Sequence, residues 1–271
     1  MVSSVRIICV AMLAIQAMLL LIYFKFRADN IVFNGNAVSE LDTLNVNAEK
    51  SAESKSQECI KMYNTNVDFQ ANIAYVPGKS VMMDPASIET MCRVLAEQSQ
   101  ADVLEWGSGG STAFFARFAR SWHSVEHDAK WGATVRTDLE KAWLLAPAGP
   151  VTLDIVEPDE EWLGDDGTAR QFSSYCNAPR DLNATRTYDL ILIDGRARVH
   201  CAAVVLRDGL LRGEGSVVIV HDFERGEYQT VLGMWYEAIE WERTGERQLV
   251  VMRPLEKQRW APLPPRMVPG D

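Results

Sequence analysis

The sequence predicts an α/β fold of the Rossmann-like type, which is an open, mostly parallel sheet with helices on both faces. Three observations predict this fold. A buried strand at residues 102–106 stops at a glycine turn that opens a helix, and strands then alternate with helices as far as residue 222. The apolar run at residues 188–194 suits a strand that is covered on both faces. The chain has 271 residues, enough for one substantial domain with additional segments.

The elements follow from local signals in chain order. Asp84 and Pro85 look like the N-cap and first position of a helix over residues 86–98. After it we expect strand 102–106, helix 111–120, strand 122–126, helix 128–145, strand 151–156, strand 188–194, helix 196–211, strand 215–222 and helix 228–236. Residues 238–243 and 247–253 are expected to close the sheet as an antiparallel hairpin. Residues 157–187 form a long polar insert, and an insert of this length usually has a functional reason.

The glycine turn at residues 103–112, Val-Leu-Glu-Trp-Gly-Ser-Gly-Gly-Ser-Thr, is the most informative segment. Gly107 and Gly109 allow a tight turn and a close approach to a ligand, because neither carries a Cβ atom. Glu126 ends the next strand, where a carboxylate can accept hydrogen bonds from a ribose diol. Strand, glycine turn, helix, strand and acid together predict a site for an adenosine-type cofactor at the edge of a parallel sheet.

Two cofactors suit such a turn, and the residues favour S-adenosylmethionine over NAD. A dinucleotide fingerprint has glycines at its first, third and sixth places, whereas the sixth place here is Thr112. Glu105 would repel a pyrophosphate, but its charge suits the cationic methionine part of S-adenosylmethionine. The third interpretation is a glycine turn that binds no ligand.

Polar groups lie at the ends of several predicted strands, which are the positions where open α/β sheets bind ligands. These groups are Glu105 with its glycines, Glu126-His127-Asp128, Asp194-Gly195-Arg196 and His221-Asp222. Each has an ordinary alternative, since Asp128 suits a helix cap and His221 suits a satisfied polar residue. Asp194 ends a hydrophobic strand and precedes a glycine, so we expect its carboxylate to face the cleft.

Four segments resemble class I S-adenosylmethionine-dependent methyltransferases: Leu104–Thr112, Ser124–Asp128, Asp194–Cys201, and His221–Arg225 with Tyr228. The resemblance covers roughly residues 75–255, and it points to a poorly characterised group with a Glu-Trp/Tyr-Gly-Ser-Gly-Gly-Ser-Thr turn and an Asp-Gly-Arg-x-Arg-Val-x-Cys helix start. It implies a seven-stranded methyltransferase sheet, with Asp154 or Glu157 near the adenine. It also implies that the cofactor-binding residues are Glu105, Gly107, Ser108, Gly109, Gly110, Ser111, Thr112, Glu126 and His127.

The resemblance also implies that Asp194 faces the reacting methyl group or the acceptor. Because the sulfonium donor is already activated, the protein must align the acceptor, exclude water and accept a proton. Asp194 and His221 are candidate bases, and Asp222 belongs to the same catalytic set. Some O-methyltransferases of this class hold a divalent metal here, so Asp194 and Asp222 are possible ligands for Mg²⁺ or Mn²⁺.

Arginine side chains near these acids have two interpretations. Arg196 and Arg225, with Tyr228, are candidate acceptor-binding residues, and they suit an acidic acceptor such as a uronate. Alternatively, Asp222 pairs with Arg196 or Arg225 in place of binding a metal. Arg198 could bind an acidic acceptor in the same way, but a structural ion pair is slightly favoured for it.

The N-terminus predicts a membrane anchor. Residues 7–24 are apolar apart from Gln16. This segment is just long enough for a helix that spans a membrane. The flanking residues favour an uncleaved signal anchor over a cleaved signal peptide. The flanking charge is balanced and does not give the orientation, but a short span followed by a polar stem suits a single-pass type II protein of the endoplasmic reticulum or Golgi. The expected organisation is a signal-anchor segment at 1–27, a disordered stem at 28–58, a methyltransferase-like domain at 59–255 and a proline-containing tail at 256–271.

The cysteines outside the membrane segment allow disulfides, but four cysteines have three possible pairings and the sequence does not choose between them. Cys59 and Cys176 fall in irregular segments and are the better candidates for a bridge. Cys92 and Cys201 fall in helical patterns, where buried thiols are expected.

The sequence therefore predicts a membrane-anchored methyltransferase that acts on a hydroxyl or carboxyl group of a small molecule or glycan. The net charge of −10 argues against a nucleic-acid partner, and the oligomeric state is left open. One alternative is a glycosyltransferase of the same topology. Its usual Asp-x-Asp motif is matched by neither Asp165-Asp166 nor Asp159-Glu160-Glu161. The other alternative is a non-catalytic scaffold of the same fold.

Overall fold

The structure, a computed structural model, describes residues 35–70, 76–98, 100–162, 166–243 and 247–258. The chain divides into two compact units, Met1–Glu49 and Lys50–Asp271, and the second contains the sheet. The predicted membrane segment, residues 7–24, lies outside the described residues. Within the described ranges, no helix combines the length and the apolar character that crossing a membrane requires.

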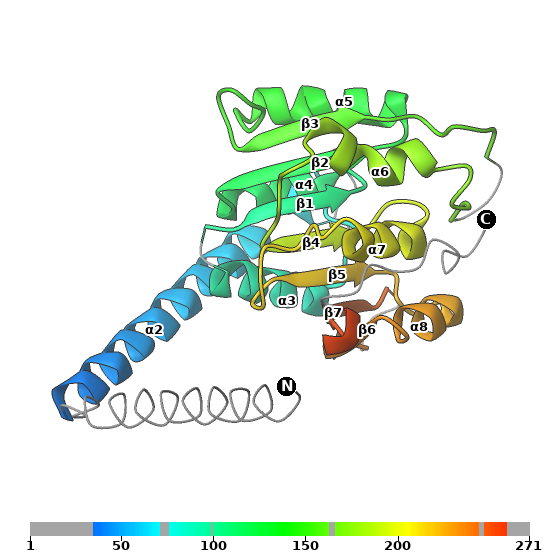
Figure 1. The fold of residues 1–271 in the computed structure, drawn as a ribbon. Coiled ribbons are helices and arrows are strands. Elements are labelled where there is room, and N and C mark those ends of the chain that lie inside the picture. Colours follow the sequence, from blue (N-terminus) through cyan, green and yellow to red (C-terminus); the bar gives the residue numbers. More distant parts are fainter. Residues whose placement is uncertain (1–34, 71–75, 99, 163–165, 244–246, 259–271) are drawn as a thin grey trace, which may run out of the picture. The chain divides into compact units, whose positions relative to one another are not determined.

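The sheet has seven strands in the order β3-β2-β1-β4-β5-β7-β6, which runs from top to bottom in Figure 1. The strands are β1 (Asp102–Trp106), β2 (Ser121–Glu126), β3 (Val151–Ile155), β4 (Leu190–Ile193), β5 (Val217–His221), β6 (Tyr236–Glu242) and β7 (Leu249–Pro254). The first five are parallel, and β7 runs antiparallel to β5 and β6. This confirms the predicted Rossmann-like sheet and its closing hairpin. Because β1 pairs with both β2 and β4, the strand order reverses beside β1, where such sheets bind ligands.

Helices cover both faces of the sheet because alternate residues of each strand point to opposite sides. One hydrophobic core contains residues of α3 (Pro85–Glu97), α4 (Gly110–Phe115), α5 (Ala129–Lys141) and the end of α2 (Gly35–Thr65). The other contains residues of α6 (Ser173–Leu182), α7 (Arg198–Arg207) and α8 (Gly226–Leu232). Val103 lies in the first core and the adjacent Leu104 in the second. Short 3-10 helices lie at Val67–Phe69, Ala116–Phe118 and Glu256–Gln258.

Two element predictions need correction. The insert at 157–187 contains α6, whose buried face is formed by residues such as Tyr175 and Cys176. The predicted helix over 228–236 is too long, because α8 ends at Leu232 and Tyr236 already begins β6. In both segments the secondary structure depends on packing against the sheet, which the local pattern of polar and apolar residues does not reveal.

The segment at 28–58, expected to be a disordered stem, is helical from Gly35 onward as part of α2. Ser56, Cys59 and Tyr63 are buried, and their spacing of three and four residues puts them on one face of the helix. Because the segment as a whole is rich in polar residues, the short amphipathic stretch at its C-terminal end was not predicted. The helix therefore belongs to the fold at its C-terminal end, where its buried face packs into the first core.

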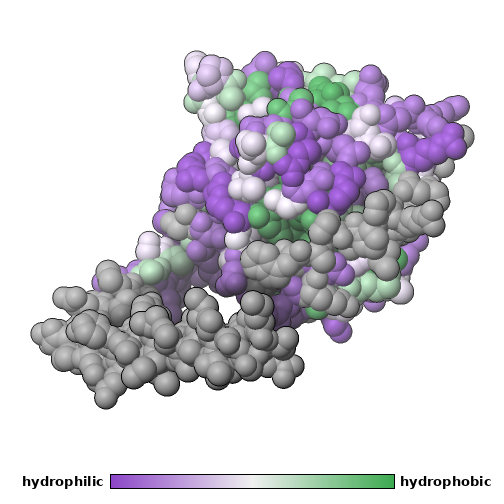
Figure 2. Space-filling view, viewed as in Figure 1, coloured by the Kyte–Doolittle hydropathy of each residue, from purple (hydrophilic) through white to green (hydrophobic). Residues whose placement is uncertain are grey.

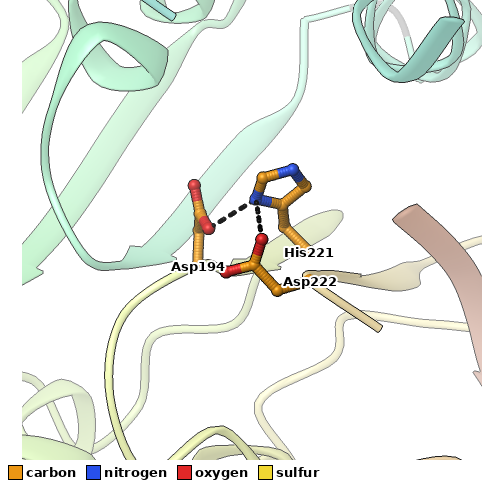
Figure 3. Close-up of side chains that lie close together, drawn as sticks. All are labelled: Asp194, His221 and Asp222. Carbon is orange, nitrogen blue, oxygen red and sulfur yellow. Dashed lines mark hydrogen bonds and ion pairs between the residues drawn. The ribbon is translucent and has the colours of Figure 1, made fainter. Parts of the chain in front are cut away.

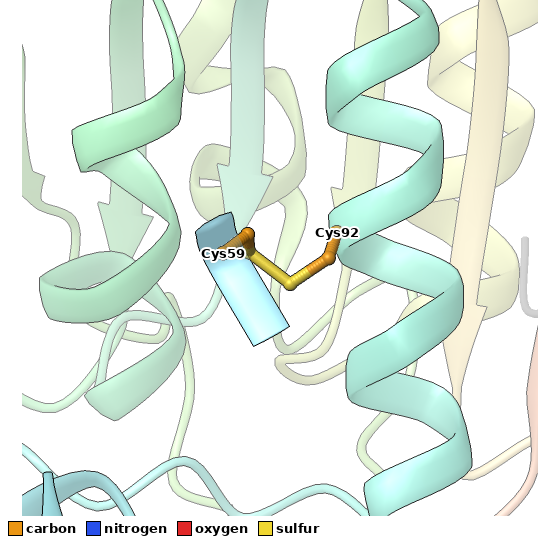
Figure 4. The surroundings of a disulfide bond; sticks show 2 residues. All are labelled: Cys59 and Cys92. Atoms are coloured by element: carbon orange, nitrogen blue, oxygen red, sulfur yellow. A yellow bond between two sulfur atoms is a disulfide. The ribbon is translucent and has the colours of Figure 1, made fainter. Parts of the chain in front are cut away.

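A disulfide joins Cys59 of α2 to Cys92 of α3, with Cα atoms 5.7 Å apart (Figure 4). The expectation that Cys59 and Cys176 were the candidates for a bridge, with Cys92 a thiol, is therefore wrong. It assumed an irregular segment around Cys59, whereas α2 carries this residue to the face of α3. Cys176 and Cys201 are both buried thiols, and their sulfur atoms lie 3.1 Å apart between α6 and α7.

The surface seen in Figure 2 is mostly hydrophilic, with small hydrophobic patches. Large exposed apolar side chains include Trp143 after α5, Leu182 at the end of α6 and Met234 after α8. Apolar residues exposed singly on separate elements are ordinary in soluble domains. These side chains do not form one continuous apolar surface.

Candidate active site

The glycine turn packs closely against the backbone of two other segments of the chain. Gly107 has a φ of +95°, and a Cβ atom there would lie 2.7 Å from the backbone of Gly195. A Cβ atom on Gly110 would lie 2.0 Å from the carbonyl oxygen of Ser80. Both positions therefore require glycine, because no side-chain carbon fits. The turn is fixed between the segment before α3 and the loop after β4.

Glu105 lies behind this turn, whereas the sequence analysis expected it on the wall of the ligand site. It is fully buried, and its carboxylate accepts hydrogen bonds from Ser111 Oγ, Thr112 Oγ1, Trp122 Nε1 and Ser124 Oγ at 2.6–2.8 Å. Burial raises the pKa of Glu105 to about 7, although these hydrogen bonds oppose the rise.

Thr112 is also placed behind the turn. It is fully buried, and its hydroxyl donates to Glu105 while accepting from Gly109 N. Glu105 and Thr112 therefore hold the turn in shape from behind, and neither lines the cavity described next.

A cavity of about 470 Å³ opens where β1, β2, β4 and β5 end, a size typical of small-ligand sites. Among the residues named from the sequence, those on its wall are Gly107, Ser108, Gly109, Gly110, Ser111, Glu126, His127, Asp128, Asp194, Gly195, Arg196, Arg198, His221 and Asp222. The cavity is also lined by five residues that the sequence did not predict: Ser80, Met82, Trp131, Trp162 and Arg247. The only signal for any of these was the length of the insert that carries Trp162.

Two predicted acceptor residues lie away from this cavity. Arg225 donates from NH1 to the hydroxyl of Tyr228, and its guanidinium lies 5.6 Å from the centre of the Tyr228 ring. Tyr228 lines a separate cavity of about 450 Å³ beside α7 and α8. The structure thus places these two residues outside the strand-end cavity.

Glu126 is buried at the cavity wall and is held by donors of its own chain. One carboxylate oxygen accepts from Ser108 N at 2.8 Å and Ser108 Oγ at 3.0 Å, and the other accepts from the N–H groups of His127 and Asp128 at 2.8 Å. Burial raises the pKa of Glu126, but His127 and the backbone N–H groups outweigh it and hold the pKa below its ordinary value. Asp128 also caps α5, accepting from Trp131 N, as the sequence allowed.

Opposite Glu126, the ends of β4 and β5 form a cluster of Asp194, His221 and Asp222 (Figure 3). His221 Nδ1 lies 2.8 Å from Asp194 Oδ1 and 3.7 Å from Asp222 Oδ1. The other ring nitrogen, Nε2, points away from both carboxylates and has no partner among the described residues. Burial lowers the pKa of His221, but Asp194 and then Asp222 outweigh burial and raise it above its ordinary value.

Arg198 is the cation that balances these acids. Its NH2 lies 2.8 Å from Asp222 Oδ2 and 3.6 Å from Asp194 Oδ1, and its NH1 donates to the carbonyl oxygen of His221. The partner of Asp222 is therefore Arg198, where the sequence analysis had weighed Arg196 and Arg225. Arg198 is itself buried, so each of these charges has a partner in the cluster.

The same cluster is the candidate metal site of the sequence analysis. Ligand atoms of Asp194, His221 and Asp222 lie within 4.8 Å of one another, as a small cation would need. However, the guanidinium of Arg198 already forms ion pairs with both carboxylates. Two unit charges of like sign about 4 Å apart repel by about 4 kcal/mol near a protein surface. The residues therefore fit an ion-paired histidine better than a divalent metal.

No protein-family model matches the chain, and no curated protein matches it. Among solved structures it is similar to a methyltransferase-like protein of Silicibacter pomeroyi, with 26% identity, a TM-score of 0.47, and coverage of 70% of this chain and 93% of that one. The SAH-bound methyltransferase PaMTH1 of Podospora anserina has 15% identity, a TM-score of 0.48 and coverage of 83% and 98%. A methyltransferase of Pyrococcus furiosus has 13% identity, a TM-score of 0.42 and coverage of 72% and 96%.

Proposed function

We propose that this chain is an S-adenosylmethionine-dependent methyltransferase that transfers a methyl group to a hydroxyl of its acceptor. One observation carries the proposal. A single cavity is lined by the glycine turn and Glu126 at the ends of β1 and β2, and by His221 at the end of β5, whose buried Nε2 has no partner among the described residues. The glycine turn and Glu126 suit a nucleoside and His221 suits the role of proton acceptor, which are the two parts such a reaction needs.

In the part of the cavity that we assign to the nucleoside, a ligand can approach the backbone closely. The backbone of Gly107–Gly110 lines the cavity, and Glu126 faces it from the end of β2. All the acceptor positions of Glu126 are taken by its own chain, so a ribose must replace one donor. The Ser108 hydroxyl is that donor, because it can rotate away while the backbone N–H groups stay in place.

His221 acts as the general base in this proposal. The Nδ1–H group of His221 donates a hydrogen bond to Asp194, which fixes the tautomer in which Nε2 is free to take a proton from the acceptor hydroxyl. Arg198 and Asp222 hold the dyad in place from behind. S-adenosylmethionine supplies, when bound, a methyl group on a positively charged sulfur that needs no further activation. Metal ions have no part in this proposal, because Arg198 occupies their electrostatic role.

The proposal extends to location and acceptor on sequence grounds. The apolar residues 7–24 support a type II membrane anchor, and an anchor in the secretory pathway supports a glycan or glycan-derived acceptor. Expression of the full chain with a C-terminal tag, followed by protease protection of microsomes, tests this orientation. Digestion of the tag in sealed microsomes would contradict it.

Calorimetric titration of the full chain with S-adenosylmethionine, NAD and a nucleotide sugar tests the cofactor. We expect binding of S-adenosylmethionine alone, with an affinity at least tenfold weaker in Glu126→Ala. Preference for a nucleotide sugar would favour a glycosyltransferase, and no binding by the folded protein would favour a scaffold.

A screen of hydroxyl acceptors with labelled methyl donor tests the base. His221→Gln should bind the cofactor as wild type does but lose about 10²-fold or more in rate. Arg225→Gln, outside the cavity, is the matched control and should keep the wild-type rate. An undiminished rate in His221→Gln would remove the base assignment.

A further inference from the structure

Arg196 and Trp162 form a pair on the cavity wall that the reaction described above does not use. Arg196 lies in the turn between β4 and α7, two residues after Asp194, and Trp162 lies in the insert between β3 and α6. The guanidinium carbon of Arg196 lies 5.0 Å from the centre of the Trp162 ring. A guanidinium stacked on an indole keeps its in-plane donors free for a ligand.

Both residues have buried donors without partners. Arg196 Nε and Trp162 Nε1 are shielded from solvent and make no hydrogen bond within the described part of the chain. Trp162 Nε1 and the guanidinium can only donate, so each needs an acceptor atom. Unsatisfied buried donors are rare and costly in native proteins, and two on one ligand cavity indicate that a ligand supplies the acceptor atoms.

The charges around the cavity point to the sign of that ligand. Glu126 accepts hydrogen bonds from its own chain, Asp222 pairs with Arg198, and Asp194 contacts His221 and Arg198. Arg196, by contrast, has no ion-pair partner among the described residues. The cavity wall thus contains a guanidinium that no carboxylate of the described residues contacts, two residues after Asp194.

We infer that Arg196, stacked on Trp162, binds a carboxylate of the acceptor, and that the acceptor is a hydroxy acid whose hydroxyl faces His221. This inference rests on the proposed function and names its substrate class. A carboxylate fits better than a neutral group because the guanidinium fork binds it through charge-assisted hydrogen bonds. The same chemistry is present in the methionine part of the cofactor, so the test separates these two sources.

Matched pairs of small probes test the acceptor source by binding alone. The full chain, with and without saturating SAH, is titrated by calorimetry with D-glucuronate, L-lactate and 4-hydroxybenzoate and with the amide of each. We expect at least one carboxylate to bind about tenfold or more tightly than its amide, as a charge-assisted contact predicts. Equal affinity for acid and amide in every pair, or no binding of any acid, would overturn the inference.

Variants tie the preference to Arg196. Arg196→Gln should reduce the acid-over-amide ratio to about twofold or less, and Arg196→Lys should retain part of it, because lysine keeps the charge but loses the fork. Arg225→Gln removes an arginine that also stacks on an aromatic ring but lies outside the cavity, and it should keep the wild-type ratio. A full ratio in a folded Arg196→Gln variant would contradict the assignment.

The cofactor source is separated by comparing SAH with 5′-methylthioadenosine, which lacks the carboxylate. Arg196→Gln could weaken the binding of SAH but not of 5′-methylthioadenosine, and leave the acid-over-amide ratio intact. In that case Arg196 binds the carboxylate of the cofactor, and the hydroxy-acid inference is wrong. If wild type binds neither nucleoside yet still prefers acids over amides, the proposed function fails while the carboxylate site stands.

Discussion

His221 shows how three neighbours can set the chemistry of one side chain. Asp194 and Asp222 stabilise its charged form, Arg198 opposes them, and burial also favours the neutral form. The raised pKa is the net result, and a base with a raised pKa is active only above that value. The acid limb of the pH–rate profile should therefore lie above the ordinary histidine pKa.

Asp194→Asn tests this balance. Removing the carboxylate removes the largest influence that raises the pKa of His221, so the acid limb of kcat/KM should move to lower pH. The plateau rate should fall by roughly 10²-fold or more, because the tautomer is no longer fixed. Initial rates between pH 5 and 9 measure both effects. If the acid limb of the Asp194→Asn profile lies at the same pH as that of wild type, a group other than His221 titrates there.

Glu105 makes a second prediction, on stability. Its folded pKa of about 7 lies above the ordinary 4.5, so the folded state binds the proton more tightly than the unfolded state does. Its contribution is fully present below about pH 4.5 and is lost as the pH rises to about 7, on the order of 3 kcal/mol in total.

Glu105→Gln should lack this loss. Urea unfolding of both proteins at pH 4.5, 6 and 8 gives the difference in the free energy of unfolding. As the pH rises, the free energy of unfolding of the glutamine variant should increase relative to that of wild type. A difference that stays constant with pH would mean that Glu105 does not titrate in this range.

At the scale of elements, the disulfide between α2 and α3 should be a main source of stability. It closes a loop across a sequence separation of 33 residues, which stabilises by about 3–4 kcal/mol in the chain-entropy account. Replacing Cys59 and Cys92 together by alanine should lower the free energy of unfolding by about that amount. Reductant should destabilise wild type and leave the double variant unchanged. Insensitivity of wild type to reductant would contradict the bridge.

The contact between the glycine turn and the segment before α3 makes a sharper prediction. A methyl group in Gly110→Ala would meet the Ser80 carbonyl oxygen at 2.0 Å, so one of the two backbones must move. Overpacking of this kind costs about 1–3 kcal/mol, and the affinity for SAH should fall with it. Gly213→Ala, with no atom within 4 Å of the added carbon, is the control and should stay near wild type. Equal behaviour of the two variants in chemical unfolding and in SAH titration would refute the contact.

At the scale of the whole molecule, alternating strands and helices and the apolar strand at β4 were enough to predict the sheet, because these patterns are local. The Cys59 pairing, the helix α6 and the walls formed by Ser80 and Arg247 depend on segments distant in sequence, and no local pattern encodes such contacts. Glu105 illustrates the limit at a single residue. Its position at the strand end was predicted, but its direction is set by partners on β2 and α4.

The cofactor should stabilise the whole domain. A ligand that binds only the folded state adds about 2.7 kcal/mol at a concentration 100 times its Kd. We therefore expect saturating SAH to raise the melting temperature of the full chain, measured by differential scanning calorimetry. Mg²⁺ or a chelator should leave the melting temperature and the methyl-transfer rate unchanged, because Arg198 balances the acids. Activity that depends on Mg²⁺ would reverse the metal assignment.

The position of Ser80 on the cavity wall has a practical consequence. A truncated protein that begins at Asp102 would retain every strand of the sheet, yet it would lack one wall of the binding cleft and both of the disulfide-linked helices, α2 and α3. The smallest useful fragment for crystallisation or screening must therefore start upstream of Ser56, well outside the boundaries that the sheet alone suggests.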